Sequence, residues 1–191
     1  MFEVAIERAA KFTRAIHTIT RNFDSEVVHP GAATLFFVNA EGWALTCKHV
    51  AELVAASDGV NAKYSQFKNE VQRLVTGGKK VKVAKREAQN KFGFYDGTTI
   101  QIKNSFIDCI DANSNGEMRL HPSLDLALIH FQNWQTPFTD FALFPRETNS
   151  FKAGKFICRL GYPFPEFNNF EYSRLDDDIK WTTNGIQGTL Q

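Results

Sequence analysis

The 191-residue sequence predicts an all-β fold with two helical additions, one at the N-terminus and one as a basic insertion. Three observations favour β structure: an aromatic share of 13% that includes 18 Phe, a clear hairpin signal near residue 40, and several later apolar runs. Hydrophobic residues make up 43% of the chain, which is enough for a sizeable core. Residues 15–145 can supply a six-stranded β-barrel, whereas residues 146–191 can supply only two or three strands of a second one.

The first elements follow from periodicity and from turn residues. Residues 2–12 place apolar side chains near one face of a helix, and the β-branched stretch 15–21 predicts a first strand. Pro30 and Gly31 predict a loop. The segments "ATLFFVN", "AEG" and "WALTCKHV" then predict a hairpin, in which Gly42 offers the positive φ that a tight turn often needs.

Residues 56–95 differ in charge from the rest of the chain and predict a helical insertion. Between Lys63 and Lys91 there are nine Lys or Arg and two Glu, a net charge of +7. The whole chain carries +1, so the remainder carries −6 (1 minus 7). A solvated helical face is the expected structure, and a contact surface is the alternative. The segment fits no nucleic-acid module, so no nucleic-acid partner is expected.

Strand signals return after the insertion and divide the chain near residue 145. "TTIQIKNSFIDCID" and "LDLALIHF" predict strands that belong to residues 1–145. "RETNSFKAGK" predicts a linker, and "FICRLGYP" and "IKWTTNGIQGTLQ" predict strands of residues 146–191. The loop "DANSNG" begins like an EF-hand but has Pro122 where a bidentate Glu should stand, so a hairpin turn is expected.

Two side chains stand out as candidates for chemistry. His49 ends the predicted hairpin and could be a catalytic base, a metal ligand or a structural histidine. Asp125 directly precedes Leu-Ala-Leu, where an acid is costly to bury unless a partner satisfies it; the alternative is an Asp at the solvent end of a strand. Gly161 and Pro163 on their own indicate only a turn.

Taken in order, "GAATLFFVNAEGWALTCKHV", "LDLALIHF" and "FKAGKFICRLGYP" resemble the trypsin-like serine proteases, especially their bacterial, HtrA-like members. The resemblance covers residues 31–55 and 120–190. It implies a chymotrypsin-like fold whose first β-barrel is complete and whose second is partial. It also implies hydrolysis of peptide bonds in a protein or peptide substrate, with His49 as general base, Asp125 as its orienting carboxylate, and no cofactor or metal.

The nucleophile of that family is missing from the sequence. It lies in Gly-x-Ser-Gly-Gly, and none of the eight serines here stands beside a glycine. The resemblance therefore implies an inactive fragment, whose serine would follow within roughly 20–40 residues of Gln191 and whose own missing C-terminal part is a candidate partner. The alternative is a protease-like binding or regulatory module without catalysis, because a fold does not fix a function.

The remaining signals concern cysteines and location. Cys47, Cys109 and Cys158 match no zinc-site spacing and predict three reduced, buried thiols in a cytoplasmic protein. Cys158 is discounted as a nucleophile because its sequence context reads as a strand. No apolar run approaches the length of a transmembrane helix, and the N-terminal stretch is not a signal peptide, so no membrane partner is expected.

Overall fold

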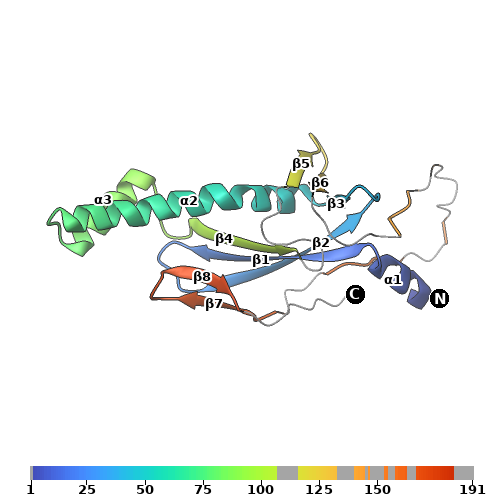
Figure 1. Ribbon diagram of the computed structural model, residues 1–191, viewed down its shortest axis with the longest axis horizontal. Helices are drawn as coiled ribbons and strands as arrows, with labels where there is room; N and C mark the ends of the chain where they lie inside the picture. The colour runs from blue at the N-terminus through green and yellow to red at the C-terminus, as the bar shows by residue number, and fades with distance from the viewer. Residues whose placement is uncertain are drawn as a thin grey trace.

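The computed structural model describes residues 2–106, 116–132, 140–144, 146, 153–154, 158–162 and 167–182. Its elements, drawn in Figure 1, are α1 (Phe2–Ala10), β1 (Thr13–Asn22), β2 (Val28–Phe37), β3 (Trp43–Thr46), α2 (Lys48–Thr76), α3 (Val81–Phe92), β4 (Thr99–Phe106), β5 (Gly116–Leu120), β6 (Ala127–Phe131), β7 (Phe170–Ser173) and β8 (Asp178–Trp181). The helix α1 and the strand β1 confirm the first two elements expected from the sequence.

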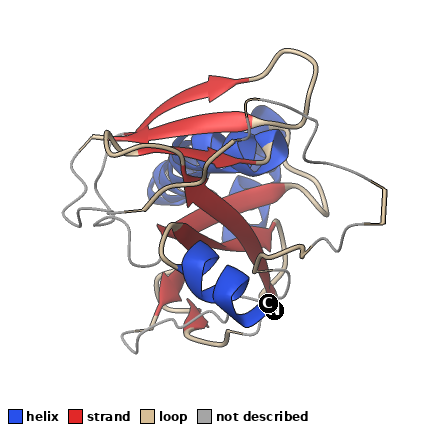
Figure 2. Ribbon diagram, turned by 90° about the vertical axis from the view of Figure 1, so that its right-hand side faces the viewer, coloured by secondary structure: helices blue, strands red, loops and turns tan. Residues whose placement is uncertain are grey.

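The fold is mixed α/β, so the prediction of an all-β, chymotrypsin-like barrel is wrong. Six antiparallel strands form one curled sheet in the order β4-β1-β2-β3-β6-β5. The sheet curls into a half-barrel that stays open, with β4 and β5 as its two edge strands. The long helix α2 lies along the sheet, and β7 and β8, near the C-terminal end of the described residues, form a separate two-stranded sheet (Figures 1 and 2).

The main reason for the wrong class is the 29-residue helix α2, which is part of the core. The return strand of the hairpin, expected to run to Val50, ends at Thr46, and the helix begins at Lys48. Val50 and Val54 are one helical turn apart and pack on the sheet beneath. This core cluster comprises Ile16, Leu35, Phe37, Ala44, Val50, Val54, Ile129 and Phe131. The burial of Val50 and Val54 against the sheet thus favours a helix over a strand in this segment.

The outer half of α2 packs with α3 and confirms that the basic insertion is helical. Tyr64 and Phe67 of α2 are buried, as is Ala88 of α3. They join Phe23, Phe94 and Ile100 in a second apolar cluster. The helix α3 ends at Phe92 and is capped by Gly93, whose φ of 66° is the left-handed conformation that glycine adopts readily. The charged side chains of the insertion therefore lie on the outside of a helical pair whose inner face is apolar.

The expected loop at Pro30 and Gly31 lies inside β2, so this prediction is also wrong. These residues pair with Ile19 and Thr18 of β1. Only Phe36 and Phe37 of β2 pair with β3, so the other edge at Pro30 has no partner strand among the described residues, and the missing N–H of proline costs no ladder bond there. A Cβ on Gly31 would approach the Thr18 Oγ1 to 2.6 Å, which explains why a glycine suits this position.

The hairpin of β7 and β8 packs against β1 and β4. Sequence reasoning anticipated β8 but not β7, whose "FEYS" carries little apolar alternation. The division of the chain at residue 145 stays a prediction. Within the described part of the chain, no helix combines the length and the apolar character needed to cross a membrane.

Candidate functional site

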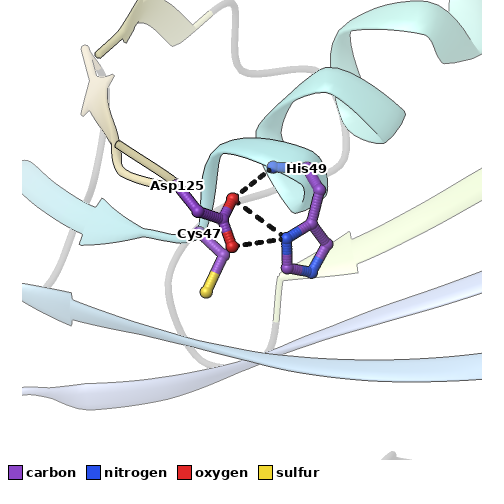
Figure 3. Close-up of side chains that lie close together, drawn as sticks. All are labelled: Cys47, His49 and Asp125. Atoms are coloured by element: carbon purple, nitrogen blue, oxygen red, sulfur yellow. Dashed lines mark hydrogen bonds and ion pairs between the residues drawn. The ribbon is translucent and has the colours of Figure 1, made fainter. Parts of the chain in front are cut away.

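His49 and Asp125 lie side by side although 76 residues separate them in the sequence (Figure 3). The ring Nδ1 of His49 lies 2.8 Å from Oδ2 and 3.0 Å from Oδ1 of Asp125. The backbone N–H of His49 also donates to Oδ1, at 3.0 Å. The side chains remain open to solvent, with exposed fractions of 69% for His49 and 56% for Asp125. The two residues that sequence reasoning selected therefore form one hydrogen-bonded pair.

The pairing of β3 with β6 creates this proximity. Thr46 at the end of β3 stands opposite Ala127 at the start of β6. His49 follows Thr46 by three residues, in the first turn of α2, and Asp125 precedes Ala127 by two. The Thr46 hydroxyl donates to the Thr34 carbonyl at 2.8 Å, which anchors the end of β3 to β2. The pair is thus set by strand register and by the start of a helix.

The electrostatics favour an ionised Asp125. The backbone N–H of His49 holds the pKa of the Asp125 carboxyl below its ordinary value; partial loss of hydration opposes this effect, and the His49 ring adds to it. An ionised carboxylate only accepts hydrogen bonds, so the Nδ1 of His49 carries the proton. The other ring nitrogen, Nε2, has no hydrogen-bond partner among the residues that the structure describes. It is therefore free to accept a proton.

The third motif also reaches this region. The backbone N–H of Tyr162 donates to the Thr34 hydroxyl at 2.7 Å, and Thr34 is the residue whose carbonyl anchors Thr46. A Cβ on Gly161 would come within 3.0 Å of the same hydroxyl, so glycine permits the close approach. Pro163 lies outside the described residues. The described part of the Gly-Tyr-Pro motif thus docks beside the strand end that carries the pair.

Cys47 is exposed, which corrects the expectation of a buried thiol. Cys158 is half-buried, both are free, and Cys109 lies outside the described residues. Partial desolvation of the Cys47 thiol and the nearby Asp125 charge raise its pKa, and Arg159 opposes them. A thiol with a raised pKa is a poor nucleophile. The Cys-x-His spacing was visible in the sequence, but it indicates a shared site only once Asp125 is known to lie beside it.

Among the described residues, no serine nucleophile is found at the pair. No serine hydroxyl in these ranges hydrogen-bonds to His49, whose ring forms hydrogen bonds only with Asp125 there. The hydroxyl of Ser57, the nearest serine in α2, donates instead to the carbonyl of Val54. Most of the EF-hand-like loop, residues 111–115, lies outside the described residues, and Gly116 begins β5.

A cavity of about 470 Å³ lies away from the pair, between α2 and the turn of the β7–β8 hairpin. Neither His49 nor Asp125 lines it. Its wall includes a buried Arg21, which donates to the Asp177 carboxylate at 2.8 Å and to the Gln101 amide oxygen at 2.6 Å. Sequence reasoning missed this network, because nothing in the strand "AIHTITR" reveals that its last residue is a buried cation.

Comparison with known proteins adds no assignment. No protein-family model matches the chain, and neither a curated protein nor a solved structure matches it. What the structure defines is a curled antiparallel sheet with a long packed helix and, at their junction, an exposed His–Asp pair.

Proposed function

We propose that the chain is part of a trypsin-like serine endopeptidase, in which His49 is the general base and Asp125 its orienting carboxylate. The observation that carries the proposal is the double attachment of Asp125 to His49, through the ring Nδ1 at 2.8 Å and the backbone N–H at 3.0 Å. This attachment leaves Nε2 facing away from the carboxylate. The substrate would be a protein or peptide, and the proposed location is the cytoplasm.

The chemistry follows from the tautomer that Asp125 imposes. With the proton on Nδ1, the lone pair on Nε2 can take the proton of a serine hydroxyl as that hydroxyl attacks a peptide carbonyl. Asp125 then stabilises the imidazolium without itself becoming protonated. Nε2 returns the proton to the leaving amine, which completes the first half of hydrolysis.

The proposal requires a serine and oxyanion donors from outside these 191 residues, because the sequence contains no Gly-x-Ser-Gly-Gly. The 69% exposure of the His49 side chain leaves room for such a segment on its open side. The 191 residues alone are expected to be inactive, because the backbone donors of an oxyanion hole usually supply a large part of the catalysis.

The second candidate is a protease-like binding or regulatory module. One observation favours it: Lys82, Lys85 and Arg86 share one side of α3 by their spacing, and no ion pair engages them within the described part of the chain. Such a surface suits an acidic partner. In this case the His49–Asp125 pair would be only a structural contact.

A fluorophosphonate probe on the longest natural translation product separates the two candidates. A serine endopeptidase should be labelled at one serine, and His49→Ala and Asp125→Asn should each slow labelling by several orders of magnitude, about 10⁴-fold for the Asp change. His29→Ala and Asp140→Asn are matched surface controls that should label as the wild type does. A folded natural product without labelling would overturn the endopeptidase proposal and leave the binding module.

A further inference from the structure

We propose that Cys47, His49 and Asp125 form a binding site for a zinc ion. One ligand atom from each residue, the Cys47 Sγ, a His49 ring nitrogen and an Asp125 carboxylate oxygen, lies within 4.8 Å of the other two. Figure 3 shows the thiol and the imidazole on either side of the carboxylate. All three residues are exposed, so an ion can reach them from solvent.

The backbone sets this arrangement before any ion arrives. Cys47 directly precedes α2 in an extended conformation, with φ −72° and ψ 143°, and His49 lies in the first turn of the helix. Asp125 enters from the loop between β5 and β6, and the His49 backbone N–H fixes its carboxylate at 3.0 Å. One of the three ligands is therefore held in place, and only the thiol and the imidazole need to adjust.

The adjustment is small. In a tetrahedral zinc site, nitrogen and oxygen ligands about 2.0–2.1 Å from the ion stand about 3.3 Å apart, and a sulfur ligand stands about 3.5 Å from each. The His49 Nδ1 and the Asp125 Oδ2 are now 2.8 Å apart, so they must separate by about half an ångström. The sulfur is within 4.8 Å of both partners and must approach by at most about 1.3 Å. Rotation of exposed side chains supplies such shifts.

The set of donors selects the metal. Thiolate, imidazole and carboxylate are the three ligand types of zinc, whereas magnesium and calcium prefer oxygen ligands alone. Three protein ligands leave a fourth position for water. On binding, the Cys47 thiol loses its proton to the buffer, and the proton of His49 moves from Nδ1 to Nε2 when Nδ1 is the ligand.

This tautomer change gives the site a regulatory consequence, which rests on the proposed function. A protonated Nε2 cannot accept the proton of a serine, so zinc would switch off the general base. The metal site itself does not depend on the presence of a serine. It can therefore be tested on the 191-residue chain.

The test is titration of the reduced chain with Co²⁺, followed by displacement with Zn²⁺. We expect one ion per chain and a near-ultraviolet thiolate-to-cobalt charge-transfer band that Zn²⁺ abolishes. Cys47→Ser should remove the band, and His49→Gln and Asp125→Asn should each weaken binding by about tenfold or more, as the loss of even outer-shell partners does. Cys158→Ser and His29→Gln are matched controls that should bind as the wild type does.

Nitrogen NMR of the histidine rings keeps the test decisive if a variant misfolds. Zinc added to the wild-type chain should shift the ring resonances of His49 and leave those of His29 in place. A chain without a thiolate band, a band that persists in Cys47→Ser, or zinc binding that leaves His49 unchanged would overturn the site. Failure of fluorophosphonate labelling on the natural product with cobalt binding intact would instead overturn only the proposed function and the regulatory consequence.

Discussion

Two aspartates of this protein each bind a basic side chain from a distant part of the sequence, but in opposite surroundings. Asp177 binds Arg21 across 156 residues, and Asp125 binds His49 across 76. The Arg21 side chain is 4% exposed, whereas that of His49 is 69% exposed. The first pair closes the β7–β8 hairpin onto the sheet, and the second lies exposed where β3 leads into α2 and the β5–β6 loop leads into β6.

The two pairs differ most in how many of their polar atoms are satisfied. Besides Asp177, Arg21 donates to Gln101, to the Ser25 carbonyl and to the Tyr64 hydroxyl. The hydroxyls of Tyr64 and Tyr172 both donate to Asp177. His49, by contrast, keeps Nε2 without a partner among the described residues. A saturated buried pair stabilises a fold, and an open pair has an atom available for chemistry.

The largest effect is expected from Asp177→Ala. Removing one partner of a buried ion pair leaves the other charge uncompensated, at a cost of about 3–5 kcal/mol in the free energy of unfolding. The Asp177 side chain is 36% exposed, so the lower end of that range is expected. Denaturant unfolding measures it. The control, Asp125→Ala, removes an exposed partner and should leave the free energy of unfolding close to that of the wild type; equal losses would contradict the comparison.

This contrast also separates what the sequence could reveal from what it could not. His49 and Asp125 were found because each stands at the end of an apolar strand in a pattern that a known family uses. Arg21 stands at the end of an equally apolar strand, but its partners are scattered over α2, β4 and the β7–β8 turn. Only tertiary packing brings such partners together, so no local pattern could predict them.

The second effect concerns Tyr64, which links the buried pair to α2. Its hydroxyl accepts from Arg21 at 3.2 Å and donates to Asp177. Tyr64→Phe should lower the free energy of unfolding by about 1.5–3 kcal/mol, the usual contribution of a hydrogen bond to a charged group. Thermal or denaturant unfolding measures it. Tyr95→Phe is the matched control, since that side chain is 69% exposed; a similar loss there would show that the hydroxyl of Tyr64 has no special role.

The third expected effect is a loss of stability in acid, as the pair of Arg21 and Asp177 weakens. Burial alone would raise the pKa of Asp177, but hydrogen bonds from Tyr64 and Tyr172 and the charge of Arg21 hold it below its ordinary value. The unfolded carboxyl, with a pKa of about 3.9, then binds more protons than the folded one. Stability from this group is therefore complete above about pH 4 and is lost as pH falls through the lowered folded pKa.

Unfolding free energies measured across this acid window provide the check. Asp177→Asn should flatten the acid limb, because the residue no longer titrates. Asp140→Asn, which removes the ion-pair partner of the exposed Lys11 side chain, should leave the limb as it is in the wild type. An unchanged limb in Asp177→Asn would assign the acid sensitivity to other groups.

The fold class shows the same limit on sequence reasoning. The strands β1, β4 and β6 were predicted from periodicity to within a few residues of their bounds, and the helical character of the basic insertion was predicted, although α2 begins eight residues before the expected start at residue 56. Residues 47–50 were predicted to continue the strand "WALTCKHV", yet they begin α2, and Val50 and Val54 join the core cluster with Phe37 and Ile129 at helical spacing. Helix and strand compete for such short apolar runs, and here the tertiary core decides between them.

The smallest effect on stability, and the sharpest test of the open pair, is expected from Asp125→Asn. The amide can still accept the backbone N–H of His49, so the free energy of unfolding should stay close to that of the wild type. The tautomer of His49 should nevertheless change, because the amide NH₂ can donate to Nδ1 and move the ring proton to Nε2. Nitrogen NMR of the histidine rings distinguishes the two tautomers directly. Asp140→Asn should leave His49 protonated at Nδ1, and a His49 ring that is the same in Asp125→Asn as in the wild type would mean that the carboxylate does not orient it.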